Sequence, residues 1–253
     1  MALDEAILVG VGLGKSPPTL RLYSWSPACL SLGQAQSYSD VDLARLQSRG
    51  WDIVRRVTGG RAILHTDELT YSVITPHTET IIAGTVLESY QRLAQALLWA
   101  VRAMEVRVEI QTMQAANQTT PLPICFEVPS SYEITVDGKK LIGSAQARRK
   151  EGVLQHGSLP LHGDLTRICQ VLRFEREAER AETAKRLLEK ATTVESVLGR
   201  ELSWEEVSQA FRQGFEVQLG VDFVPESVSR DEEERAQQLM AEKYTHPVWT
   251  QRV

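Results

Sequence analysis

The chain contains few cysteines: three among 253 residues, all far apart in the sequence. Their spacing matches neither the short repeats of a zinc site nor the even set of a disulfide framework. We therefore expect no metal site and no disulfide scaffold, a usage that fits a reducing cytosol. Cys29 lies in an apolar stretch, where a buried and inert thiol is the usual outcome.

Long apolar runs and net positive charge are also absent. No stretch approaches the roughly 18 consecutive apolar residues that indicate a transmembrane helix, and no basic segment precedes an apolar one at the start, as a signal peptide requires. The formal net charge of −5 argues against a nucleic-acid-binding protein. We therefore expect a cytoplasmic protein that binds neither membranes nor nucleic acid.

The sequence does contain a mixture of strand and helix patterns. Short alternating stretches are interspersed with amphipathic helical patterns, and hydrophobic residues make up 42% of the chain, enough for an ordinary core. This mixture predicts an α+β fold with helices packed against mixed, mostly antiparallel sheets. The sequence shows no repeat and no low-complexity linker, so we expect a single domain over residues 1–253.

Helix starts are marked by local capping patterns. Thr85 and Ser203 each precede a glutamate three residues later, which is a capping box. Asp40 is expected to cap a short helix, and Val86 to begin the apolar face of a longer one. Gly10–Ser16 resembles a phosphate-binding loop but lacks the first glycine of that pattern, so we interpret it as a turn.

A tight hairpin is predicted over residues 132–146. Apolar residues alternate with polar ones up to Val136, and Asp137-Gly138 is a strong two-residue hairpin turn, because such a turn needs positive φ at both centres. Lys140 then lies at the start of the return strand. Spacing alone favours a different interpretation, in which Lys139 and Lys140 are solvated turn lysines, because lysine is seldom buried.

Positive charge is clustered in two blocks of this acidic chain. In the first, arginines precede Gly59-Gly60, where the backbone can approach a ligand closely, although a plain turn is the alternative. A lone His65 nearby is more often structural than catalytic. If the fold brings the blocks together, they form a local basic face that steers an acidic partner. The blocks comprise Arg55, Arg56, Arg61, Lys139, Lys140, Arg148, Arg149 and Lys150.

Two motifs, in order, resemble the lipoate/biotin protein ligase family. The first is Arg55-Arg-Val-Thr-Gly-Gly-Arg-Ala-Ile-Leu-His65, with Leu69-Thr-Tyr-Ser72 behind it, and the second is Gly138-Lys-Lys140-Leu-Ile-Gly143-Ser-Ala-Gln146 with Leu154-Gln-His156-Gly-Ser158. The resemblance implies a class II aminoacyl-tRNA synthetase/biotin protein ligase-like fold with one catalytic domain. It also implies a strand ahead of residue 1, so we expect either an upstream native start or an exposed sheet edge.

Within that family, Cys125-Phe-Glu ahead of the hairpin resembles the cysteine-dependent octanoyltransferases. These enzymes move octanoyl from acyl carrier protein to the H protein of the glycine cleavage system. The resemblance implies that Cys125 forms a thioester, that Lys140 positions the carbonyl, and that no cofactor is used. The acceptor would be a lipoyl-domain protein, either the H protein or a dehydrogenase subunit. The implied substrate-binding residues are Gly33, Gln34, Arg56, Thr58, Gly59, Gly60, His65, Gly143, Ser144, Gln146, His156 and Gly157.

Three functions besides this octanoyltransferase remain compatible with these motifs. ATP-dependent lipoate-protein ligases share both motifs, and an octanoyl amidotransferase that uses octanoyl-H protein as donor is also cysteine-dependent. Another octanoyltransferase class has its nucleophile later in the chain, beside Pro and Gly, but Cys169 has Ile168 and Gln170 as neighbours, so the chain does not match that class. A non-catalytic carrier-binding module would need neither Cys125 nor Lys140.

Overall fold

The computed structural model describes residues 1–111 and 133–253, so Cys125 lies outside the described residues. The helices are α1 (Ala2–Gly12), α2 (Leu43–Ser48), α3 (Val86–Ala103), α4 (Glu177–Lys190), α5 (Val194–Leu198), α6 (Trp204–Leu219), α7 (Arg230–Leu239) and α8 (Pro247–Thr250). The strands are β1 (Thr19–Tyr23), β2 (Cys29–Leu32), β3 (Asp52–Arg55), β4 (Ile63–His65), β5 (Glu68–Thr75), β6 (Glu109–Gln111), β7 (Glu133–Val136), β8 (Lys139–Arg149) and β9 (Gly152–Pro160).

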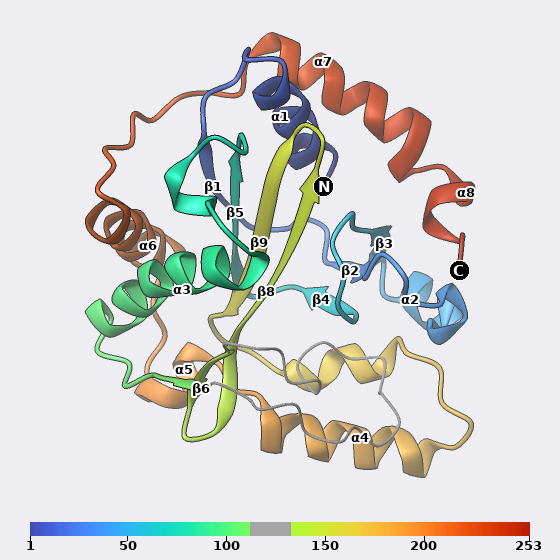
Figure 1. Cartoon of the computed structure of the whole chain (residues 1–253). Coiled ribbons are helices and arrows are strands. Elements are labelled where there is room, and N and C mark those ends of the chain that lie inside the picture. Colours follow the sequence, from blue (N-terminus) through green and yellow to red (C-terminus); the bar gives the residue numbers. More distant parts are fainter. Residues whose placement is uncertain (112–132) are drawn as a thin grey trace.

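Two sheets organise the molecule. The larger has the order β1-β5-β9-β8-β7-β6 and is antiparallel throughout, whereas the smaller has the order β3-β2-β4 and pairs β2 with β3 in parallel. Figure 1 shows the small sheet beside the long β8–β9 hairpin of the large one. The predicted α+β fold with mixed, mostly antiparallel sheets is confirmed.

Alternation along the strands gives the large sheet two different faces. On one face, Tyr71 and Leu159 of the sheet pack in one hydrophobic cluster with Leu97 of α3 and Phe211 of α6. Both capping boxes are confirmed at the N-termini of these helices, but Val86 is 51% exposed and does not join the apolar face. On the opposite face, α1 packs on β5 and β9.

Three local predictions can be compared with the structure. Asp42 caps α2 with its side chain, and Asp40 instead ends a short 3₁₀ turn. The segment from Gly10 to Gly12 is still helical, so the turn begins only at Leu13. The tight hairpin turn itself is confirmed, since Asp137 and Gly138 have φ of 49° and 75°.

Three arginines of the predicted basic face, Arg55, Arg56 and Arg148, instead bind backbone carbonyls. Arg55 is fully buried and donates to the carbonyls of Gly33, Gln36 and Thr250. Arg148 is half-buried and donates to the carbonyls of Ile82, Gly84 and Thr85. These arginines satisfy the hydrogen-bonding needs of loop and helix-end carbonyls. A buried carbonyl without a partner would destabilise the fold. Arg56 is also buried.

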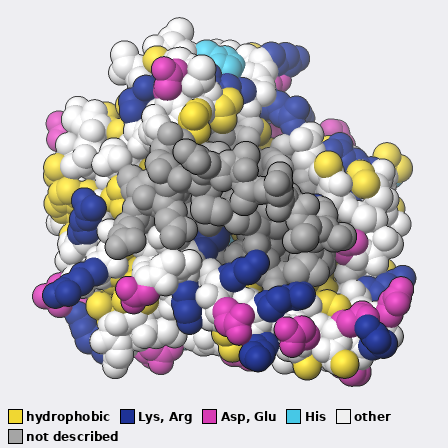
Figure 2. Space-filling view, turned by 60° about the horizontal axis from the view of Figure 1, so that its bottom comes forward, with side chains coloured by type: hydrophobic (Ala, Val, Ile, Leu, Met, Phe, Trp, Pro, Cys, Tyr) yellow, Lys and Arg dark blue, Asp and Glu magenta, His cyan; other side chains and the backbone are white. Residues whose placement is uncertain are grey.

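Charge elsewhere on the surface is mixed. Along α4, Arg176 pairs with Glu179 and Arg180 with Glu177, as helical spacing predicts. Figure 2 shows Lys and Arg side chains interspersed with Asp and Glu on the face that includes this helix. Within the described ranges, no helix is long and apolar enough to cross a membrane.

Candidate functional site

A cavity of about 240 Å³ lies between the two sheets. Its wall draws on β2 and β4 of the small sheet, on β5, β8 and β9 of the large sheet, and on the loop after β3. The lining residues are Met1, Ser31, Arg56, Gly60, Arg61, Ile63, His65, Thr70, Lys140, Gly143, Ser144, Ala145, His156, Gly157 and Ser158. The two sequence motifs, far apart in the chain, therefore meet at one cavity.

Most of the predicted site residues border this cavity. They are Arg56, Gly60, His65, Lys140, Gly143, Ser144, His156 and Gly157. Of the remaining predicted residues within the described ranges, Gly33, Gln34, Thr58 and Gly59 support the wall from behind, and Gln146 lies on the other face of the sheet. The nucleophile predicted at Cys125 belongs to the part of the chain outside the described residues.

Lys140 is buried in the cavity wall rather than solvated. Only 4% of it is exposed, and its carbonyl accepts from the Thr192 amide at 3.1 Å. Lys139, next in sequence, points away and donates its Nζ to the Leu188 carbonyl at 2.8 Å. The β7–β8 hairpin thus places one lysine of the pair at the cavity and the other at the surface. The interpretation of both as solvated turn lysines is wrong.

The glycine loop after β3 is held by Arg56 and by close backbone packing. The Arg56 guanidinium donates to the carbonyls of Ser31, Gly59 and Arg61 at 3.0, 2.9 and 2.7 Å. A Cβ at Gly33 would lie 1.8 Å from the Gly60 carbonyl oxygen, so the two chains approach as only glycine permits. The arginine here shapes the wall instead of remaining solvated.

Gln34 and Thr58 fix the same loop from behind. The Gln34 amide donates to the Thr58 carbonyl at 2.9 Å. The Thr58 hydroxyl lies 2.6 Å from Nε2 of His156, a fully buried contact. The loop therefore connects directly to a histidine of β9.

His156 is a buried, neutral imidazole. Burial lowers its pKa to about 3, a trend that the Asp4 carboxylate opposes and the Arg56 guanidinium reinforces. Its Nδ1 is buried and has no hydrogen-bond partner among the residues that the structure describes. The Thr58 hydroxyl and Nε2 share a hydrogen bond in which either atom can be the donor, depending on the tautomer of the ring. His156 therefore places a neutral imidazole in the cavity wall.

Alternation along β8 and β9 separates the remaining predicted residues. The Ser144 hydroxyl contacts the Tyr71 hydroxyl at 2.7 Å, and the Gln146 amide donates to Gln155 at 3.0 Å. A Cβ at Gly157 would lie 2.6 Å from the Tyr71 ring. These positions face the helix layer, so Ser144 and Gly157 border the cavity through their backbones and Gln146 does not line it.

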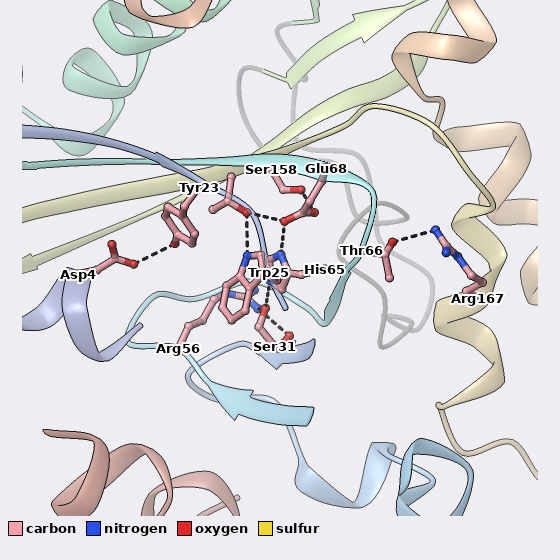
Figure 3. Close-up of polar contacts among 11 residues, drawn as sticks. Asp4, Tyr23, Trp25, Ser31, Arg56, His65, Thr66, Glu68, Ser158 and Arg167 are labelled. Atoms are coloured by element: carbon pink, nitrogen blue, oxygen red, sulfur yellow. Dashed lines mark hydrogen bonds and ion pairs between the residues drawn. The ribbon is translucent and has the colours of Figure 1, made fainter. Parts of the chain in front are cut away.

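Sequence analysis missed a buried network centred on His65. Nδ1 of His65 lies 2.5 Å from Oε1 of Glu68, and Nε2 lies 2.8 Å from the Ser31 hydroxyl. Trp25 stacks on the imidazole with ring centroids 4.3 Å apart (Figure 3). His65 and Glu68 are three residues apart, so their contact could have been predicted from the sequence. Ser31 and Trp25 come from distant segments, and no local sequence pattern predicts their contacts with His65.

Glu68 is the anion of this network. Burial raises its pKa, but the His65 ring and hydrogen bonds from His65, Ser158 and Thr70 lower it below its ordinary value overall. The carboxylate accepts from Thr70 at 2.5 Å and also from the Ser158 hydroxyl. Glu68 is therefore ionised and saturated with donors at neutral pH.

The cysteines within the described residues are poor candidates for a nucleophile. Cys29 is 5% exposed, and burial raises the pKa of its thiol to about 12. Cys169 is 1% exposed. Cys29 was expected to be buried, and that expectation is confirmed. Across the described part of the chain, no group of three His, Cys, Asp or Glu side chains is placed to hold a metal ion.

Comparison with known proteins identifies the family. The model of the lipoyl protein ligase A/B catalytic domain matches residues 1–216. Octanoyltransferase LipM of Moorella thermoacetica is 41% identical over 256 residues, covering 100% of this chain and 93% of that protein.

Solved structures give the same result. A bipartite lipoate protein ligase from Thermoplasma acidophilum superposes with a TM-score of 0.82 at 25% identity, covering 99% of this chain and 89% of that one. A lipoate-protein ligase A bound with ATP superposes with a TM-score of 0.78 at 25% identity, covering 99% and 92%. The family model matches most of the chain, and the Moorella relative covers all of it. The chain therefore belongs to the lipoyl protein ligase A/B catalytic domain family.

Proposed function

We propose that the protein is an octanoyltransferase of lipoate biosynthesis, which moves an octanoyl group from an acyl thioester to a lysine of a lipoyl-domain protein. The observation that carries this proposal is the buried Lys140 in the wall of a small cavity between the two sheets. At about 240 Å³ the cavity lies below the usual range for drug-sized ligands, which suits a short acyl group. Full-length similarity to an octanoyltransferase supports the same reaction.

The reaction we propose has two steps. The Cys125 thiolate attacks the octanoyl thioester of the donor and releases its thiol, and the acceptor lysine then attacks the resulting acyl-enzyme. A free cysteine with a pKa near ~8.5 is mostly protonated at neutral pH, so a nearby ammonium would favour the thiolate. We assign that role to Lys140, which would also stabilise the oxyanion formed in each step.

Two further observations support acyl transfer. The neutral imidazole of His156 lines the cavity without adding a charge beside the acyl group. The raised pKa of Cys29 argues against a nucleophile there and in favour of Cys125. We further propose octanoyl-acyl carrier protein as donor and the glycine cleavage H protein as acceptor, with a dehydrogenase subunit as the alternative acceptor.

Thioester chemistry needs no cofactor in this scheme. Aminolysis of a thioester is downhill, because the amide product is more stable than the thioester. The octanoyl group therefore arrives already activated, and ATP has no step to drive.

The second candidate is an ATP-dependent lipoate-protein ligase, favoured by the likeness to a ligase bound with ATP. The deciding experiment mixes the protein with octanoyl-acyl carrier protein and a lipoyl-domain acceptor, with and without ATP. We expect the same transfer rate in both mixtures and no lipoate-dependent pyrophosphate exchange. Transfer that requires ATP and free acid would replace this proposal with the ligase.

The same assay distinguishes an amidotransferase and a non-catalytic module from the proposed enzyme. An amidotransferase would transfer octanoyl only when the donor is octanoyl-H protein. A non-catalytic carrier-binding module would form a complex with the carrier but would give no product, whether octanoyl-acyl carrier protein or octanoyl-H protein is the donor. We expect transfer from octanoyl-acyl carrier protein to the H protein.

A further inference from the structure

The cavity between the two sheets has a second layer of backbone behind part of its wall, and what this layer does depends on the proposed function. Gly60 belongs to the inner loop, residues 58–61, and borders the cavity. The outer loop, residues 33–36, lies behind it, and a Cβ at Gly33 would lie 1.8 Å from the Gly60 oxygen. The two loops are therefore in direct backbone contact, so the outer loop limits how far Gly60 can move away from the cavity.

Two consecutive arginines hold these loops separately. Arg55 is the last residue of β3, and successive side chains of a strand point to opposite sides. Arg56 donates to the two carbonyls on either side of Gly60. Arg55 instead donates through Nη1 to three carbonyls of the outer loop, at 2.6 to 3.3 Å. Arg56 thus holds the inner loop and Arg55 holds the outer one.

The other edge of the Arg55 guanidinium binds the C-terminal segment, residues 243–253. Nη2 and Nε both donate to the Thr250 carbonyl, at 2.9 and 3.1 Å, and the Trp249 indole N–H donates back to the Arg55 carbonyl at 2.8 Å. Figure 1 shows α8, which contains these two partners, beside the small sheet. Because the guanidinium is a rigid planar fork with five donors, this one side chain joins the outer loop to the C-terminal segment.

The C-terminal segment is itself anchored at both ends. The Lys243 ammonium lies 2.7 Å from both carboxylate oxygens of Glu5 in α1, and the Tyr244 hydroxyl donates to the same carboxylate at 2.6 Å. At the other end, the Tyr38 amide donates to the main-chain oxygen of Val253 at 2.7 Å. Since α1 packs on the large sheet, the segment bridges the large sheet and the loop that follows β2 of the small sheet.

We propose that Arg55 is a positioning residue that sets the acyl-chain length accepted by the cavity. It joins the outer loop to the anchored C-terminal segment, which holds Gly33 against Gly60 and keeps the cavity small. Without Arg55 the outer-loop carbonyls lose their donor and the loop reorients, because a buried carbonyl without a partner is costly. Gly60 then has room to move aside for a longer chain. Arg55 acts only through the two loops, since it does not itself border the cavity.

The test measures how fast the full-length protein loads octanoyl and decanoyl from their pantetheine thioesters, with intact-protein mass spectrometry as the readout. The ratio of the two loading rates does not depend on the fraction of folded protein, so it separates cavity shape from stability. We expect wild type to prefer octanoyl and Arg55→Lys to reduce that preference by about tenfold, the low end of what one methylene is worth in a fitted pocket. Lysine keeps the charge, but its compact ammonium cannot bind both segments.

A second variant and a matched control complete the comparison. Trp249→Phe keeps an aromatic ring in the C-terminal segment but removes the hydrogen bond to the Arg55 carbonyl, so it should reduce the preference by a smaller factor. Arg148 also donates to three backbone carbonyls, and none of those three residues borders the cavity. Arg148→Lys should therefore keep the wild-type ratio.

Four results would overturn the role of Arg55. They are a wild-type ratio in both Arg55→Lys and Trp249→Phe, equal slowing of both thioesters in Arg55→Lys, the same loss of preference in Arg148→Lys, and a wild-type protein that loads octanoyl and decanoyl equally. Equal slowing would mean that Arg55 only stabilises the fold. A wild-type protein that loads no acyl group from either thioester would instead refute the proposed function, and the role of Arg55 with it.

Discussion

The buried neutral His156 should make the protein lose stability as the pH falls from 7 to 5. Its pKa is lowered from 6.5 to about 3 in the folded state, because burial disfavours the imidazolium. Between these two values the unfolded chain binds a proton at this residue and the folded chain does not. Stability must therefore fall with falling pH in this window.

The magnitude follows from the size of the window. At pH 5 the unfolded side chain is about 1.5 pH units below its ordinary pKa, and each unit is worth about 1.4 kcal/mol. His156 should therefore contribute a loss of about 2 kcal/mol between pH 7 and pH 5. The lowered pKa values of Asp4 and Glu68 act at lower pH, below their ordinary values of 3.8 and 4.5. The two pH ranges are separate.

Urea unfolding of wild type and His156→Gln tests this reasoning. Glutamine keeps a polar group within reach of Thr58 but does not titrate. The free energy of unfolding should decline between pH 7 and 5 by about 2 kcal/mol more in wild type than in the variant. Parallel declines in the two proteins would refute a neutral buried His156.

Three further predictions concern other residues. Lys140→Ala should slow acylation by about a hundredfold or more, the usual loss on removal of an oxyanion donor, whereas the same change at surface-directed Lys139 should leave the rate of thiol release unchanged. Arg55→Ala should lower the free energy of unfolding by about 3 kcal/mol, because it leaves several buried carbonyls unpaired, and urea melts will measure it. Gly33→Ala should reduce acyl transfer, since a Cβ there would lie 1.8 Å from the Gly60 oxygen, and a variant with wild-type transfer would contradict this close contact.

Local features of the fold were predictable from the sequence because their causes are local. The capping boxes at Thr85 and Ser203 and the Asp137-Gly138 turn depend on residues within three or four positions of one another. The mixed sheets followed from the same short patterns. Gly33 was named as a site residue by resemblance, and the structure gives the physical reason in its contact with Gly60.

Features that depend on distant parts of the chain could not be predicted in this way. Spacing favoured a solvated Lys140, whose burial depends on its pairing with Ala191 beyond α4. Arg55 was placed in the predicted basic face, but its partners include Thr250 at the far end of the chain. The Ser31 contact of His65 spans 34 residues and involves no motif.

The central claim is that octanoyl is carried on Cys125 as a thioester. Mass spectrometry of the intact protein after mixing with an octanoyl thioester, followed by peptide mapping, tests it most directly. We predict one octanoyl adduct on wild type, on Cys29→Ser and on Cys169→Ser, and none on Cys125→Ser. An adduct that persists in Cys125→Ser and disappears in one of the other two variants would contradict the account.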